Sequence, residues 1–183
     1  AWLCSHDTVR DTIPFPRTVN EHTHNKAHVQ QTIQTKSRVD TIDITEDVND
    51  ALTVDHGACH ITTQHTTCGL TVNEAHDPRL ADDIHDALND IAPRDKDYAH
   101  DRVDGNADAH IKASLIGHDV TLPVRNNDLV LGRWQRILLF EFDGSRQRTI
   151  TIRAHQENRI GTQRQRNIAG LVIFTVLLIA WSS

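Results

Sequence analysis

The sequence predicts a single α+β domain, built mostly from antiparallel strands in a sheet or sandwich, with two helices in its first half. Short runs of alternating apolar and polar residues recur through residues 29–153. Strand fragments with two helices come first and hairpin signals follow, which favours α+β over a repeated strand–helix–strand pattern. There is no glycine-rich phosphate loop. At 183 residues the chain is long enough for one hydrophobic core.

The first half is expected to hold four strands and a short helix. Two strands are predicted within residues 29–44. Polar and acidic residues at 45–47 then indicate the start of a helix that would bury Val48, Ala51 and Leu52. Two further strands, at 58–64 and 69–73, flank a turn that contains His65.

The second helix has the clearest signals in the chain. Asp77 is a suitable N-cap, and Pro78 suits the first helical position. Pro93 ends the segment. Apolar residues recur through it at helical spacing, namely Leu80, Ile84, Leu88 and Ile91.

Residues 98–114 are expected to form a polar loop ordered by this scaffold. The segment places histidines, aspartates, an asparagine, a lysine and a serine around a Gly-Asn turn, with almost no apolar periodicity. Loops held by a rigid scaffold often carry function. We therefore expect ligand or proton-transfer groups here, with Arg102 and Asp108 as solvated neighbours.

The rest of the domain is predicted to be β. Strands at 120–124 and 129–131 flank an Asn-Asn-Asp turn at 126–128, and Asn127 tolerates left-handed geometry. A long apolar strand at 134–142 leads to Asp143-Gly144, a signal for a hairpin with the alternating segment at 148–153.

Charge and cysteine content exclude some classes of protein. Residues 37–154 hold 21 acidic residues against 12 lysines and arginines, which argues against general nucleic-acid binding. The three cysteines form no CxxC pair, so a disulfide framework is not expected and a cytoplasmic location is. Cys59 and Cys68 are expected to be small buried hydrophobes.

The two ends differ from the middle. Residues 1–28 are predicted to be a poorly ordered extension without a signal peptide, and 29–154 form the domain. Residues 155–183 combine a basic linker with an apolar tail at 168–181. That tail is short for a spanning helix, so membrane attachment, a docked helix and a non-native extension all stay open.

Three histidines at element ends or in loops, His65, His100 and His110, are candidate ligands for a divalent metal, zinc or magnesium. The alternative is that they are surface histidines among the 13 in the chain.

Other candidates carry a structural alternative as well. Asn73 and Glu74 suit acid–base chemistry or a turn before the helix. Lys112 and Ser114 suit an anion or a solvated strand start. Trp134 with Gln135 suits stacking on a flat ring or the core.

Several motifs together closely resemble the YjbQ family over about residues 29–153. They are Gln64-His65-Thr66-Thr67, Asp97-Tyr98-Ala99-His100, Asp104-Gly105-Asn106-Ala107-Asp108-Ala109-His110, and Leu131-Gly132-Arg133-Trp134-Gln135. The resemblance implies a small cytoplasmic α+β protein that assembles as a trimer or larger homo-oligomer. Members are commonly labelled secondary thiamine-phosphate synthases. Arg133 and Arg136 depart from the family pattern of threonine and glycine, which would alter the charge of a pocket there.

We therefore expect a thiamine-phosphate synthase-like transferase that joins a pyrimidine diphosphate to a thiazole phosphate and releases pyrophosphate. The assigned roles are Glu74, Lys112 and Ser114 in catalysis, Asn73, Trp134 and Gln135 in substrate binding, and His65, His100 and His110 on a metal. Asp101 or Asp104 could hold magnesium. The alternatives are a metal- or small-ligand-binding homo-oligomer without significant turnover, and a zinc-dependent hydrolase.

Overall fold

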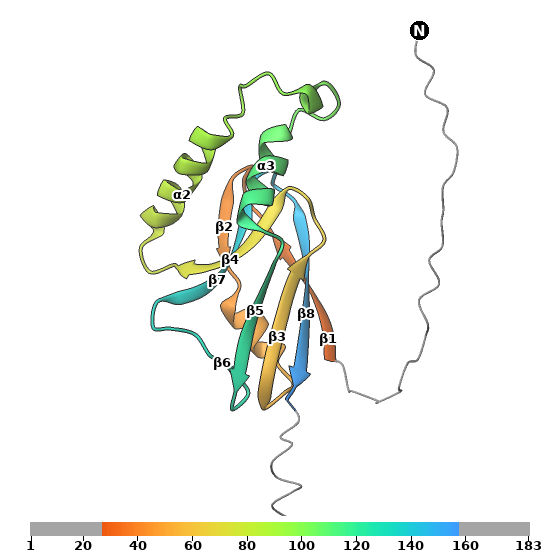
Figure 1. Ribbon diagram of the computed structural model, residues 1–183, viewed down its shortest axis with the longest axis vertical. Coiled ribbons are helices and arrows are strands. Elements are labelled where there is room, and N and C mark those ends of the chain that lie inside the picture. The colour runs from red at the N-terminus through yellow and green to blue at the C-terminus, as the bar shows by residue number, and fades with distance from the viewer. Residues whose placement is uncertain (1–26, 158–183) are drawn as a thin grey trace, which may run out of the picture.

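Two packed antiparallel sheets and a layer of helices make up the described part of the chain, residues 27–157 of a computed structural model (Figure 1). One sheet has five strands in the order β1-β8-β3-β5-β6, and the other has three in the order β2-β7-β4. The elements are β1 (Ala27–Gln34), β2 (Asp40–Asp43), α1 (Thr45–Asp50), β3 (His56–Thr63), β4 (Cys68–Glu74), α2 (Pro78–Ile91), the 3-10 helix η1 (Ala99–Arg102), α3 (Ala107–Ile116), β5 (Asp119–Arg125), β6 (Asp128–Leu129), β7 (Gln135–Glu141) and β8 (Gln147–Gln156).

The main core lies between the two sheets. Ile61 and Ile152 enter it from the five-stranded sheet, and Leu70 and Leu139 enter it from the three-stranded sheet. Val48 of α1 belongs to the same cluster and is fully buried. The predicted α+β sandwich is therefore confirmed.

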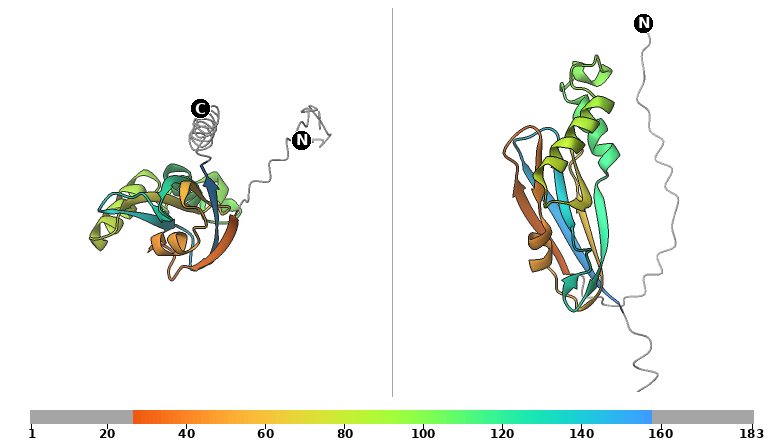
Figure 2. Two further views of the ribbon diagram at one scale, coloured as in Figure 1. Left: turned by 90° about the horizontal axis from the view of Figure 1, so that it is seen from below. Right: turned by 90° about the vertical axis from the view of Figure 1, so that its left-hand side faces the viewer.

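A second core forms where α2 and α3 cover the outer face of the three-stranded sheet. Leu138 and Phe140 of β7 pack there with Leu88 of α2 and with Ala109 and Ala113 of α3. Because β7 is buried on both faces, its sequence is a nearly continuous apolar run rather than an alternation. Both helices lie toward the upper end of the strands in Figure 1 and in the right-hand view of Figure 2.

The predicted start of α2 is confirmed in detail. The Asp77 carboxylate accepts a hydrogen bond from the Arg79 amide, and Pro78 occupies the first turn. Of the predicted apolar stripe, Leu88 is buried, but Ile91 is 63% exposed. The apolar stripe of α2 therefore extends about one turn beyond Leu88, the residue that packs in the second core.

The prediction of a loop at residues 98–114 is wrong, because η1 and α3 together fill most of this segment. Its buried residues are three alanines together with Asp108 and Lys112, a set that gives no strong apolar periodicity. Asp101 accepts a hydrogen bond from the Ala107 amide and so replaces a missing helical partner at the N-terminus. Asp108, expected in solvent, is only 3% exposed.

The Asp143-Gly144 turn does not close a hairpin. β7 pairs with β2 and β4, whereas β8 pairs with β1 and β3, so the turn carries the chain from one sheet to the other. The hairpin signal at Asn126-Asn127 is correct: both residues have positive φ and join β5 to β6.

The strands extend slightly beyond the predicted domain. β1 begins at Ala27, and β8 continues to Gln156. The predictions for residues 1–26 and for the linker and apolar tail at 158–183 lie outside the described residues. No helix within 27–157 is long and apolar enough to cross a membrane.

Candidate functional site

Two adjoining hollows lie where the β3–β4 turn meets α3. They have volumes of about 650 and 580 Å³ and share Gln64, His65, Thr66 and His110. The first also contains Ser114 and His118. The second continues to polar residues that precede α3, lie in the β7–β8 turn or begin β8, namely Asp104, Asn106, Asp143, Arg146 and Arg148.

The His65 ring is held in one orientation by the backbone of β8. Its Nε2 accepts a hydrogen bond of 2.9 Å from the Thr149 amide. An amide can only donate, so the neutral ring carries its proton on Nδ1. Burial, together with the charges of Arg148 and Arg146, lowers the pKa of His65, although Glu141 acts in the opposite direction. His65 is therefore a neutral imidazole with a defined donor.

His110 lies at the junction of three hollows. Its ring meets that of His100 edge-on, with 5.1 Å between the ring centroids. These two histidines also line a smaller hollow of about 440 Å³, together with Tyr98, Ala107 and Ile111. This third hollow is mainly apolar and is called the apolar hollow below. The second hollow is mainly polar and is called the polar hollow. His110 lines both of them.

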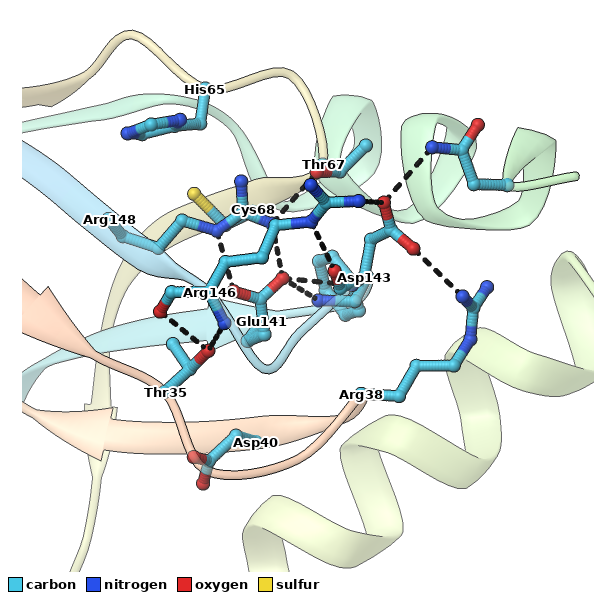
Figure 3. A network of polar contacts seen from close by, with 12 residues as sticks. Thr35, Arg38, Asp40, His65, Thr67, Cys68, Glu141, Asp143, Arg146 and Arg148 are labelled. Atoms are coloured by element: carbon cyan, nitrogen blue, oxygen red, sulfur yellow. Dashed lines mark hydrogen bonds and ion pairs between the residues drawn. The ribbon is translucent and has the colours of Figure 1, made fainter. Parts of the chain in front are cut away.

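A network of ion pairs supports the polar hollow from below (Figure 3). Arg148 and Glu141 are both buried and form a bidentate pair, and Arg148 also donates to the Thr67 hydroxyl. Each of these two side chains holds the other in place, so neither can bind a ligand without breaking the ion pair.

Asp143 organises the rim of the same hollow. Its carboxylate accepts from Arg38, Arg146 and Asn106 at 2.8 to 3.0 Å. Burial opposes ionisation, but the Asn106 hydrogen bond and the Arg146 and Arg38 charges lower the pKa of Asp143. The Arg146 side chain remains 56% exposed, so its guanidinium can reach a bound anion.

The structure does not place Lys112 in the hollows. Its Nζ is buried and donates to Asp108 at 3.0 Å and to Asn89 of α2 at 3.3 Å. Lys112 therefore joins α3 to α2 instead of facing a substrate. Ser114 does line the first hollow, but its hydroxyl donates to the His110 carbonyl at 2.8 Å.

The other predicted residues form a separate group at the far end of the three-stranded sheet. Glu74 lies opposite Gln135 in the β4–β7 pairing, next to Asn73. Six steps along β4 at about 3.3 Å each separate Glu74 from Cys68, which lines the first hollow, so the groups are roughly 20 Å apart. Glu74 lines a different hollow, beside α2.

Trp134 belongs to this second group. It is 50% exposed, stacks with Arg133 at 4.7 Å, and lies 5.3 Å from the His76 ring. Gln135 accepts a hydrogen bond from the Gly132 amide. Within the described chain, these side chains cannot act on a molecule bound beside His65.

The three predicted metal ligands are not assembled into one site. Among the side chains of residues 27–157, no three His, Cys, Asp or Glu groups are placed to hold one ion. His65 is engaged through Nε2, and His100 meets His110 only at the smaller hollow. Of the predicted magnesium carboxylates, Asp101 caps α3 and Asp104 lines the polar hollow.

Asn106 lies in the segment where ligand groups were expected, but Asp143 and Arg146 were not predicted to lie at the site. The signal for these two residues was the series of acids and arginines across residues 141–148. If this segment formed a hairpin, as predicted, these side chains would lie on two strands facing solvent. Only the passage of the chain between the sheets turns these side chains toward the histidines.

Comparison with known proteins is decisive for the family. The model for "UPF0047 protein YjbQ-like" matches residues 29–157. The chain belongs to the YjbQ (UPF0047) family. A UPF0047 protein from Archaeoglobus fulgidus is 43% identical over 126 residues, which cover 69% of this chain and 99% of the relative. YugU from Bacillus subtilis is 38% identical over 124 residues, covering 66% of this chain and 93% of YugU.

Solved structures of YjbQ-like proteins share the fold. A Sulfolobus solfataricus protein described as of unknown function has a TM-score of 0.67 and 30% identity, covering 72% of this chain and 98% of its own. A Clostridium acetobutylicum YjbQ/UPF0047 protein has a TM-score of 0.65 and 38% identity, covering 68% and 97%. The fold of the described domain is thus that of the YjbQ family.

Proposed function

We propose that this protein is a transferase acting on small phosphorylated heterocycles, of the secondary thiamine-phosphate synthase type. It would join a pyrimidine diphosphate to a thiazole phosphate. In this reaction a bond forms between the two heterocycles, the bond to the diphosphate breaks, and pyrophosphate leaves. We also propose a cytoplasmic homo-oligomer of three or more copies.

One observation carries the proposal: a polar hollow and an apolar hollow meet at His110. The polar hollow offers donors to phosphate oxygens from His65, Asn106 and Arg146. The apolar hollow, between η1 and α3, has the character of a site for a flat ring. Donors aimed at a leaving diphosphate favour the transition state, in which negative charge develops on it.

The charge of the site bears on the choice of cofactor. Arg146 and Arg148 are largely balanced by Asp143 and Glu141, so a diphosphate gains little net positive charge from the protein. Magnesium needs only one or two carboxylates when phosphate oxygens complete its shell, and Asp104 could contribute one. Resident zinc needs about three protein donors, a set that residues 27–157 do not offer. We therefore propose magnesium, which would neutralise the leaving diphosphate.

The test measures thiamine-phosphate formation by the purified protein, and growth of a thiamine-requiring strain that expresses it. We expect Arg146→Ala and His110→Ala each to reduce product formation at least tenfold. Arg146→Ala removes a hydrogen-bond donor from the polar hollow, and His110→Ala removes the side chain that lines both hollows. Glu74→Gln is the matched control and should retain activity, since Glu74 lines the other hollow. Equal activity in all three variants would contradict the proposed site.

A second candidate is a ligand-binding protein without significant turnover. It is favoured by the internal pairing of Lys112, Arg146 and Arg148, which leaves few free catalytic groups. Calorimetry with the two substrates separates the candidates. Binding that is lost in Arg146→Ala, without product in the wild type, would favour this second function.

A further inference from the structure

The chain contains two Asp-Gly pairs, Asp104-Gly105 and Asp143-Gly144. In such a pair the glycine amide nitrogen can attack the carboxyl carbon of the aspartic acid side chain, because glycine has no Cβ to crowd that nitrogen. The two pairs have the same chemistry but lie in different surroundings. One of them is held by hydrogen bonds, and the other is free.

The Asp143-Gly144 pair is held at both of its reacting groups. The Asp143 carboxylate accepts hydrogen bonds of 2.8 to 3.0 Å from Arg38, Arg146 and Asn106 (Figure 3). The Gly144 amide donates to the Arg38 carbonyl at 3.0 Å. Attack of this nitrogen on the Asp143 side chain would therefore require the loss of several hydrogen bonds, which happens only when the turn opens.

The Asp104-Gly105 pair lies in the exposed turn between η1 and α3. Within residues 27–157, neither the Asp104 carboxylate nor the Gly105 amide has a hydrogen-bond partner. Gly105 has a φ of 64°, a left-handed conformation that glycine adopts without strain. A Cβ at this position would meet no heavy atom within 4 Å. The link can therefore rotate into the geometry for attack without breaking a contact.

We propose that Asp104 is a site of spontaneous isomerisation in the folded protein, whereas Asp143 is protected. The Gly105 nitrogen forms a bond to Cγ of the protonated Asp104 side chain, and the carboxyl hydroxyl leaves as water together with the amide proton. The product is a five-membered succinimide ring. Water then opens this ring at one of its two carbonyls. Opening at Cγ restores aspartate, and opening at the main-chain carbonyl gives isoaspartate, in which the chain runs through Cβ.

Isoaspartate at position 104 changes the geometry of the polar hollow but not its charge. The residue keeps one carboxylate, whereas the main chain after Asp104 becomes one carbon longer. Asn106 follows closely, and its side chain donates to Asp143 at 3.0 Å. The Ala107 amide donates to Asp101 on the other side of the turn. Both contacts depend on the length of this turn, so isomerisation loosens the start of α3. The reaction is independent of the proposed transferase activity.

Peptide mapping of the folded protein tests the proposal, because trypsin separates the two pairs. It releases the first pair in residues 103–112 and the second in residues 137–146. After incubation in mildly acidic buffer, which keeps more of each carboxyl group protonated, we expect at least tenfold more isoaspartate at position 104 than at position 143. Chromatography separates the isomeric peptides, and electron-transfer fragmentation identifies them. Equal rates at the two positions, or no isoaspartate at position 104, would overturn the proposal.

Two controls separate the effect of the fold from that of the sequence. In urea neither pair is held, so both positions should form isoaspartate at comparable rates. If the difference persisted in urea, the hydrogen bonds around Asp143 would not be its cause. Asp104→Glu keeps the carboxylate but would have to close a less favourable six-membered ring. This variant should lose the isomer from residues 103–112 and keep the wild-type rate at Asp143, and an undiminished signal would exclude Asp104 as its source.

Hydrogen exchange tests the effect on α3. In aged protein we expect a faster-exchanging population at the Ala107 amide, in proportion to the isoaspartate measured at position 104. Fresh protein and aged Asp104→Glu provide the matched controls. Exchange at Ala107 that stays uniform and slow while isoaspartate accumulates would refute the loosening of α3.

Discussion

His65 combines two roles that a sequence cannot separate. Its ring lies at a candidate ligand site, and it also accepts a hydrogen bond from the Thr149 amide in β8. Protonation of Nε2 would replace this hydrogen bond with two opposed donors. The same contact that orients the ring therefore links site geometry to pH.

This link gives a pH dependence of stability. The unfolded chain takes up a proton at histidine near pH 6.5, whereas burial and Arg148 lower the pKa of His65 in the folded chain. Stability is therefore complete above about pH 6.5 and decreases as the pH falls toward the lowered folded pKa. His85, whose pKa burial also lowers, adds to the loss.

We expect His65→Asn to lose less stability than the wild type between pH 7.5 and pH 5. Urea unfolding at both pH values measures the free energy of unfolding of each protein. The share due to His85 should persist in the variant. Identical losses in the two proteins would show that the Thr149 hydrogen bond does not control the titration.

The buried pair of Arg148 and Glu141 gives a second prediction at this scale. Glu141→Ala leaves the guanidinium without its carboxylate, and such a loss costs about 3–5 kcal/mol. A double variant, Glu141→Leu with Arg148→Met, removes both charges and should recover much of that loss. Urea denaturation provides the comparison, and a double variant as unstable as the single one would argue against charge burial as the cause.

At the scale of elements, α3 is both one wall of the candidate site and part of the packing. Ala109 and Ala113 contact the three-stranded sheet, and Lys112 with Asp108 reaches α2 and Arg38. His110 and Ser114 face the hollows. Neighbouring residues of α3 thus have different roles: some pack against the rest of the domain, and others line the hollows. A prediction that treated the whole segment as functional therefore placed Lys112 in the site, although it packs against α2.

We expect Lys112→Met to act on stability rather than on chemistry. It leaves Asp108 with Arg38 alone, and loss of a buried charge-assisted hydrogen bond costs about 1.5–3 kcal/mol. Activity per folded molecule should stay near that of the wild type, while the urea midpoint falls. A large loss of specific activity at full folding would return Lys112 to the catalytic set.

α2 allows a matched comparison within one helix. Leu88 is 7% exposed and belongs to the second core, whereas Ile91 is 63% exposed. We expect Leu88→Ala to cost about 2–4 kcal/mol and Ile91→Ala less than about 0.5 kcal/mol. Thermal melts distinguish them, and a comparable cost for Ile91→Ala would mean that this residue is covered in the assembled protein.

At the scale of the whole molecule, most strands and α2 were predictable because their signals are local. Alternation, the Asp77 cap and the Asn126-Asn127 turn each depend on a few neighbouring residues. The residues at the site were less predictable, since Arg146 and Asp143 meet the histidines only through sheet exchange. α3 escaped prediction because its packing side is alanine and buried polar groups.

The position of β8 also constrains how the chain is made. β8 lies between β1 and β3, and its residues at 147–154 pair with the first described strand of the chain. Contacts over such long sequence separations form late and slow folding. A nascent chain that has not yet delivered residue 147 from the ribosome therefore has β1 without its neighbour and the main core open on one side. This domain therefore completes its folding only after nearly its whole length has been translated, and until then its apolar strands are exposed to aggregation.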